Sequence, residues 1–127
     1  MRWGGEEFLV LAKGWNDAEA MSRRLLNAVD SEPVASTAGA LKVSVSIGIA
    51  VLPLRVEGRA LSIERALIVA DRALYAAKNS GRNRAVCVDS LKLSSTSQLA
   101  ALEEDVLKAG DKGLAAVHTV VGDLTGA

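Results

Sequence analysis

The sequence has little cysteine and no net charge, and each of these features excludes a class of protein. One cysteine, Cys87, among 127 residues excludes an internal disulfide and a zinc site built from several cysteines. Fifteen basic and fifteen acidic residues cancel, so the whole molecule has no field that attracts nucleic acid or anionic lipid. We therefore expect a cytoplasmic protein that contacts neither nucleic acid nor membrane.

Long apolar runs are also missing. No stretch approaches the roughly 20 apolar residues that a transmembrane helix needs, and the first residues form no signal-peptide core. Half of the residues are nevertheless hydrophobic, mostly alanine, leucine and valine, and only four are aromatic. This composition argues against a disordered chain. It is typical of small-residue helices packed closely on a sheet, in one domain of mixed helices and strands.

Hydrophobic spacing and turn signals predict a series of elements. They are a strand over 6–12, a helix over 17–30, a loop over 31–40, a strand over 42–51, a helix over 62–79 and a strand over 84–89. In the strand over 42–51, one face holds valine and isoleucine, whereas the other holds only small residues, Gly48 among them. Something must approach the backbone closely on that second face, either a helix or a ligand.

The composition changes after Asp89. A polar segment follows at 94–97, and two weak helical patterns come after it, over 98–109 and 113–122. We therefore take residues 1–89 as the domain. Residues 90–127 are expected to be a C-terminal extension that is helical or partly disordered.

The sharpest chemical feature is the segment GGEEF at residues 4–8. Gly4 and Gly5 form a hairpin turn signal, and without Cβ atoms they let a phosphate or a base reach the backbone N–H groups. Glu6 and Glu7 point to opposite faces of the following strand, so one at most faces a given site. Glu6 is the better candidate to bind a hard cation such as Mg²⁺. The alternative is a plain hairpin followed by two solvated glutamates.

A second cluster, KNSGRNR at residues 78–84, places three cations around the predicted end of a helix, where Gly81 is expected as the terminating glycine. Lys78 and Arg82 could clamp a phosphate, as a point charge and a planar fork. Asp71 and Tyr75 share a helix stripe with Lys78. The alternative is that these cations only offset the helix dipole. Cys87 and His118 are expected to be structural.

Taken in order, three segments resemble the GGDEF domain of bacterial diguanylate cyclases. They read RWGGEEF at 2–8, SVSIGIA at 44–50 and ADRALYAAKNSGRNR at 70–84. The resemblance covers residues 2–89 and implies an α+β fold of the nucleotidyl-cyclase and ferredoxin-like type, an α/β sandwich with a mainly antiparallel sheet and helices packed on it. Residues 1–89 would then be a partial GGDEF domain, without the N-terminal strands and helices of the family fold.

The resemblance also implies a reaction, the condensation of two GTP molecules into cyclic di-GMP with Mg²⁺ or Mn²⁺. Two domains would present one GTP each, as a homodimer controlled by an upstream sensory or regulatory domain. Glu6 would bind the metal and act as the catalytic base, with Glu7 supporting it. Gly4 and Gly5 would lie against the nucleotide, and Lys78 and Arg82 would hold the terminal phosphates.

One departure bears on activity. The family's metal-binding aspartate, its guanine-reading residues and its Arg-x-x-Asp inhibitory site belong to family positions that no residue of this sequence occupies. We therefore expect the 127-residue chain alone to be inactive. The alternative is a non-catalytic module that binds nucleotide or a protein partner.

Overall fold

The structure is a computed structural model that describes residues 17–30, 34–37, 39–41 and 43–122. The predicted strand over 6–12 lies outside the described residues. In chain order the elements are α1 (Ala18–Asp30), β1 (Val34–Ser36), β2 (Gly39–Leu41), β3 (Ile47–Ala50), β4 (Arg55–Val56), β5 (Arg59–Ala60), α2 (Ile63–Asn79), β6 (Arg84–Leu91), the 3₁₀ turn η1 (Thr96–Gln98), α3 (Leu99–Glu104), α4 (Val106–Asp111) and β7 (Ala115–Val121).

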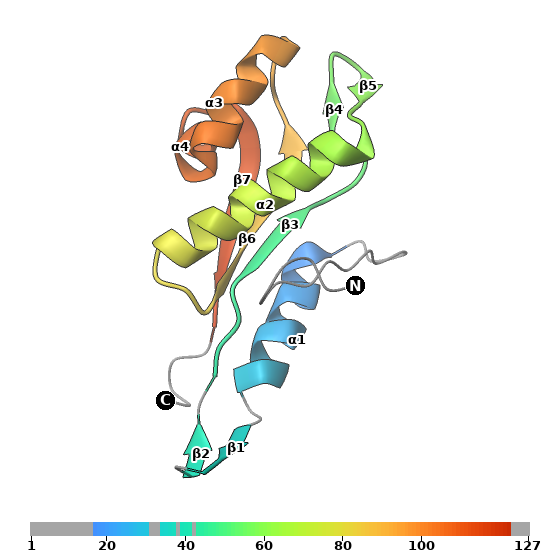
Figure 1. The fold of residues 1–127 in the computed structure, drawn as a ribbon. Coiled ribbons are helices and arrows are strands. Elements are labelled where there is room, and N and C mark those ends of the chain that lie inside the picture. Colours follow the sequence, from blue (N-terminus) through green and yellow to red (C-terminus); the bar gives the residue numbers. More distant parts are fainter. Residues whose placement is uncertain (1–16, 31–33, 38, 42, 123–127) are drawn as a thin grey trace.

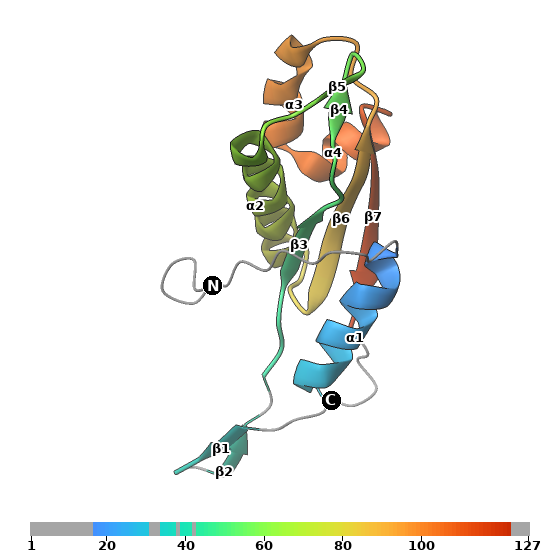
Figure 2. The same cartoon turned by 90° about the vertical axis from the view of Figure 1, so that its right-hand side faces the viewer.

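A mixed three-stranded sheet in the order β3–β6–β7 separates two layers of helices (Figures 1 and 2). β3 runs parallel to β6, and β7 runs antiparallel to β6. Helix α1 lies on one face of the sheet, while α2, α3 and α4 lie on the other. The predicted α+β class with helices packed on a sheet is confirmed.

The alternating side chains of the central strand β6 serve both layers. Val86 and Val88 belong to the larger core, with α2, α3 and α4, whereas Ala85 and Cys87 belong to the smaller core under α1. All four side chains are buried, because both faces of this strand are covered. A continuous apolar run is the pattern expected for such a strand.

The small-residue face of β3 lies against helix α2. A Cβ atom at Gly48 would stand closer than 3.0 Å to backbone atoms of Ala70 and Leu74. The close approach that the sequence predicted on this face is therefore confirmed, and its cause is a helix. The opposite face of β3 places Ile47 and Ile49 in the core under α1.

The helix boundaries follow the predicted caps. The Asp17 carboxylate accepts from the Ala20 N–H at 3.0 Å at the start of α1, and the Ser62 hydroxyl accepts from the Arg65 N–H at 3.2 Å at the start of α2. Each interaction satisfies a backbone donor that has no partner within its helix. Both predicted helices are therefore confirmed to within a residue or so at each end.

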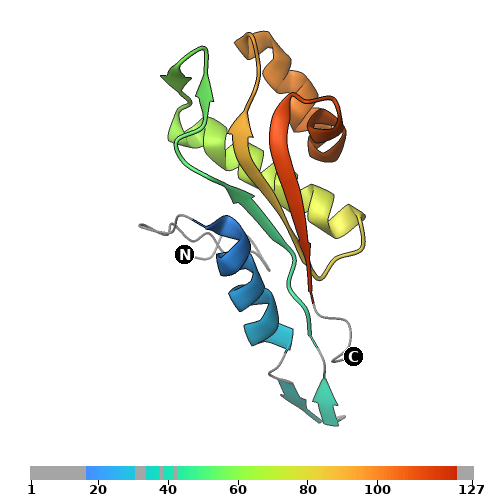
Figure 3. The same cartoon turned by 180° about the vertical axis from the view of Figure 1, so that it is seen from behind.

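The prediction for residues 113–122 is wrong, because they form strand β7 and not a helix. β7 pairs with β6 from Arg84–Val121 to Leu91–Ala115, with an irregularity between Val88 and Ser90. The spacing of Leu114, Val117 and Val121 fits either structure, and the pairing with β6 decides for the strand. Figure 3 shows the two strands lying side by side along their length.

Other differences from the prediction are smaller. The expected helix over 98–109 is interrupted at Asp105, whose carboxylate caps α4 by accepting from the Lys108 N–H at 3.0 Å. The expected loop over 31–40 contains strand residues of the β1–β2 ribbon. Regular strand in the segment 43–51 is confined to β3.

The segment that follows Asp89 shares the larger core with α2 and β6. Its buried members are Leu93, which follows β6, and residues of α3, α4 and β7: Leu99, Leu102, Val106, Ala109 and Ala115. No helix in the described part of the chain is long and apolar enough to cross a membrane.

We predict that Gly48→Ala lowers the free energy of unfolding by about 2–3 kcal/mol, because the added methyl group meets the backbone of α2, which cannot shift alone. Denaturant unfolding followed by circular dichroism measures this change. Gly110→Ala is the matched control. The new methyl group there meets the side chain of Val117 and not a backbone, so this variant should lose less stability than Gly48→Ala. Equal stabilities for the wild type and Gly48→Ala would contradict the packing described for β3 and α2.

Candidate functional site

The sequence-predicted site residues divide into two groups. Gly4, Gly5, Glu6 and Glu7 lie outside the described residues, so the structure does not place them. Lys78 and Arg82 lie within the described residues, in the last turn of α2 and in the turn that follows it. Figure 1 shows this connection between α2 and β6.

The turn after α2 has an unusual backbone. Gly81 has φ 135°, which confirms a glycine with positive φ at the end of this helix, and Arg82 and Asn83 have φ of 61° and 47°. The Ser80 N–H donates to the Ala76 carbonyl and the Arg82 N–H donates to the Ala77 carbonyl, both at 3.0 Å. These hydrogen bonds satisfy carbonyl groups at the helix end and fix the direction in which the chain leaves the helix.

The end of α2 and the turn that follows it carry one cation each. Lys78 is half-buried and Arg82 is exposed. A guanidinium presents paired N–H donors to phosphate oxygens, and an ammonium adds a compact positive charge. The arrangement can receive a polyanion such as a nucleotide phosphate. The same two cations also lie at the negative end of the α2 dipole.

Arg84 has a different role from the other two cations. Its Nε donates to the Arg82 carbonyl at 2.9 Å, and its guanidinium occupies the space that a side chain at Gly81 would need. Sequence reasoning grouped the three cations together. The structure separates them, because the described side chain of Arg84 folds back onto the turn itself.

The outer surface of α2 leads toward this turn. Asp71 is exposed and Tyr75 is 58% exposed. Both stand on the helical stripe that the sequence predicted to include Lys78.

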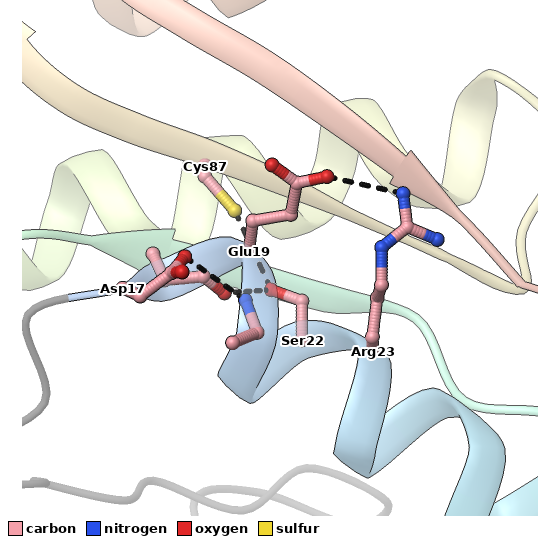
Figure 4. A network of polar contacts seen from close by, with 7 residues as sticks. Asp17, Glu19, Ser22, Arg23 and Cys87 are labelled. Atoms are coloured by element: carbon pink, nitrogen blue, oxygen red, sulfur yellow. Dashed lines mark hydrogen bonds and ion pairs between the residues drawn. The ribbon is translucent and has the colours of Figure 1, made fainter.

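Cys87 lies on the opposite side of the sheet, under α1. It is fully buried, and its sulfur lies 3.5 Å from the Ser22 hydroxyl, which also donates to the Ala18 carbonyl at 2.6 Å (Figure 4). Burial raises the pKa of the Cys87 thiol, while the Ser22 hydrogen bond opposes that change. A neutral buried thiol is a poor nucleophile. The burial expected for Cys87 is confirmed.

His118 pairs with Asp89 across the sheet. Its Nδ1 lies 2.5 Å from the Asp89 carboxylate, and Asp89 sits at the irregularity between β6 and β7. An extra residue in a strand re-aims its side chain, here toward the neighbouring strand. No sequence signal indicated this pair, because it depends on the register of β7.

Metal ligands do not gather in the part of the chain that the structure describes. Its residues contain no group of three or more histidine, cysteine, aspartate or glutamate side chains that could hold an ion. The predicted metal ligand, Glu6, lies outside that part.

Comparison with known proteins identifies the family. A family model described as "Diguanylate cyclase, GGDEF domain" matches residues 1–84. The chain belongs to the GGDEF family. The match includes the GGEEF segment at residues 4–8, and it extends through Lys78, Arg82 and Arg84.

The names of curated relatives also state a diguanylate cyclase. The chain is 34% identical over 93 residues to diguanylate cyclase DgcZ of Escherichia coli, covering 69% of this chain and 29% of the relative. It is 33% identical over 85 residues to diguanylate cyclase A of Treponema denticola, covering 65% and 22%. No solved structure matches.

A third relative is the bifunctional diguanylate cyclase/cyclic di-GMP phosphodiesterase MucR of Pseudomonas aeruginosa. The chain is 36% identical to it over 84 residues, covering 65% of this chain and 12% of the relative. Aligned with these three relatives, the chain therefore spans less than a third of their length.

We predict that the free energy of unfolding falls as the pH rises from about 8 to about 10, on either side of the ordinary cysteine pKa. Because the folded state raises the pKa of Cys87, it holds the thiol proton more tightly than the unfolded chain. This contribution to stability is full below the ordinary pKa and is lost above it. Urea unfolding at several pH values measures the slope.

Cys87→Ala is the control, because lysine and tyrosine titrate in both proteins and cancel in the difference. The variant should lose less stability than the wild type over the same pH range. Identical slopes for the two proteins would contradict this account of Cys87.

Proposed function

We propose that this chain is the nucleotide-binding and signature-bearing part of a diguanylate cyclase domain, which condenses two GTP molecules into cyclic di-GMP in bacterial second-messenger signalling. The observation that carries the proposal is the exposed Arg82 on a turn tied by hydrogen bonds, directly after the helix end that carries Lys78 and inside the segment matched by the family model. The names of the curated relatives support the same reaction.

Lys78 and Arg82 bind the terminal phosphates of GTP in this proposal. Gly4 and Gly5 let the nucleotide approach the backbone of the signature hairpin. Such a reaction at phosphorus depends mainly on positioning and on cations that spread the developing charge. Two cations from α2 and its following turn supply part of that charge.

Glu6 is proposed to hold the Mg²⁺ or Mn²⁺ ion and to accept the proton of the attacking hydroxyl, with Glu7 supporting it. One carboxylate together with phosphate oxygens is a donor set that Mg²⁺ accepts. The ion, when bound, withdraws charge from the phosphate oxygens. The described residues contribute cations to this proposed site.

The proposed reaction joins two GTP molecules held on separate domains, so a homodimer is part of the proposal. Control by an upstream sensory or regulatory domain and a cytoplasmic location also belong to it. The coverage of the relatives, at most 29% of their length, supports a setting within a longer protein.

The alternative function is a non-catalytic module that binds nucleotide or a protein partner. The two cations at the end of α2, half-buried Lys78 and exposed Arg82, suit an anionic ligand in this function as well, because holding a phosphate requires no turnover.

We predict that Arg82→Asn weakens Mg²⁺–GTP binding about tenfold, because it removes charge-assisted hydrogen bonds to phosphate. Asparagine tolerates the positive φ of this position, so the fold should be kept. Lys78→Ala should weaken binding in the same direction, and EDTA should weaken it further. Isothermal titration calorimetry measures each affinity.

The matched controls are Arg59→Asn and Lys112→Ala. Both residues are exposed, and Arg59 lies in β5, near the opposite end of α2. Each control should change the GTP affinity less than twofold. If the controls and the site variants lost equal GTP affinity, the affinity would depend only on net charge, which would contradict the proposed site.

We also predict that the 127-residue chain alone forms no cyclic di-GMP from GTP and Mg²⁺. The resemblance assigns a further metal-binding aspartate and the guanine contacts to family positions without a counterpart among these residues. Chromatography of the reaction mixture tests this. Product that appears with the wild type and disappears with Glu6→Gln would overturn the prediction.

A further inference from the structure

The turn that carries Arg82 has a backbone conformation that must be stabilised by contacts with the rest of the structure. Gly81, Arg82 and Asn83 follow one another with positive φ, and the last two have a Cβ, so they adopt such conformations seldom and at a cost. A short exposed turn of this kind persists only where surrounding contacts determine it. The contacts of this turn can be traced one by one.

The strand β7 provides the contact that is most distant in sequence. Beyond the last ladder pair, Arg84–Val121, the Gly122 N–H donates to the Asn83 carbonyl at 2.8 Å. Figures 1 and 3 show the end of β7 beside the connection between α2 and β6. The segment from 115 to 122 therefore reaches back to the turn that precedes β6.

Gly122 also fits the side chain of Asn83. Gly122 is buried, and a Cβ atom there would stand closer than 3.0 Å to three atoms of the Asn83 amide group. Within the described part of the chain, the buried Oδ1 of Asn83 has no hydrogen-bond partner. The amide group of Asn83 thus contributes packing: it fills the space left free because Gly122 has no side chain.

The hydrogen bonds of the turn are then distributed over three elements. The Arg82 N–H donates to Ala77 in α2, the Arg82 carbonyl accepts from Arg84 in β6, and the Asn83 carbonyl accepts from Gly122 after β7. Two of these elements lie next to the turn in sequence. Gly122 alone is distant.

We propose that Gly122 and Asn83 are positioning residues, which clamp the left-handed turn so that Arg82 is held for the phosphates of the nucleotide. The clamp rests on the proposed function for the role of Arg82. It assigns a task in substrate binding to a segment that lies beyond residues 1–84, the extent of the family match.

The first test measures hydrogen exchange of the Arg82 amide in the full chain, because that N–H donates to Ala77 only while the turn is formed. In Gly122→Ala we expect its protection to fall at least tenfold, while the central amides of β6 keep theirs. Gly113→Ala is the control, since Gly113 has positive φ and nothing within 4 Å of an added Cβ. That substitution strains the backbone just before β7 and adds no contact with the turn that carries Arg82.

Rescue separates the clamp from a loss of folding. Asn83→Gly removes the amide group that an alanine at 122 would strike, keeps the carbonyl acceptor and suits the positive φ. The double variant Asn83→Gly with Gly122→Ala should recover the protection of the Arg82 amide to within about threefold of the wild type.

The second test is the affinity for Mg²⁺–GTP. Gly122→Ala should weaken binding about tenfold, as Arg82→Asn does, and should add nothing further in the Arg82→Asn background. Additive losses would overturn the proposal, as would an unchanged Arg82 amide or an equal effect from Gly113→Ala. If the wild type binds no GTP, the proposed function fails, and the exchange and rescue results still decide whether Gly122 and Asn83 clamp the turn.

Discussion

The close contact between β3 and α2 is the constraint on which the rest of the structure depends. Because Gly48 has no side chain, the backbone of α2 lies directly against the strand, beside Ala70 and Leu74. The helix therefore has little freedom to slide or rotate. Its end lies where the chain can return as β6, parallel to β3, and the turn with Arg82 lies at that point. A helix seated farther from the sheet would present Lys78 and the following turn with Arg82 elsewhere.

Local chemistry made much of this arrangement predictable. The alternation in residues 42–51 indicated a strand with one small-residue face, and Ser62 and Gly81 marked the limits of α2. β7 was missed because its apolar spacing suits a helix as well as a strand. Its valines become a strand only through pairing with β6, a long-range interaction that a local pattern does not report.

The residues of the candidate site also divide into those that a local pattern predicts and those that depend on contacts formed by folding. Lys78 and Arg82 could be identified from a motif, since their identity and spacing are local properties. The separate role of Arg84 could not, because it depends on a side chain folding back onto Gly81. The contact of Gly122 with Asn83 was also hidden, since those residues are far apart in sequence and meet only when the sheet has formed. The carboxylates of the signature segment lie outside the described residues, so their roles stay predictions.

The hydrogen bond from Gly122 to Asn83 has a consequence for the order of events during synthesis. Chains leave the ribosome from the N-terminus, so β3, α2 and β6 can assemble while β7 is still inside it. The carbonyl of Asn83 meets its partner only after residue 122 has emerged. A nascent chain can therefore hold α2 and the central strand before the arginine-bearing turn is set, and the turn is completed only once the residue that follows β7 is available.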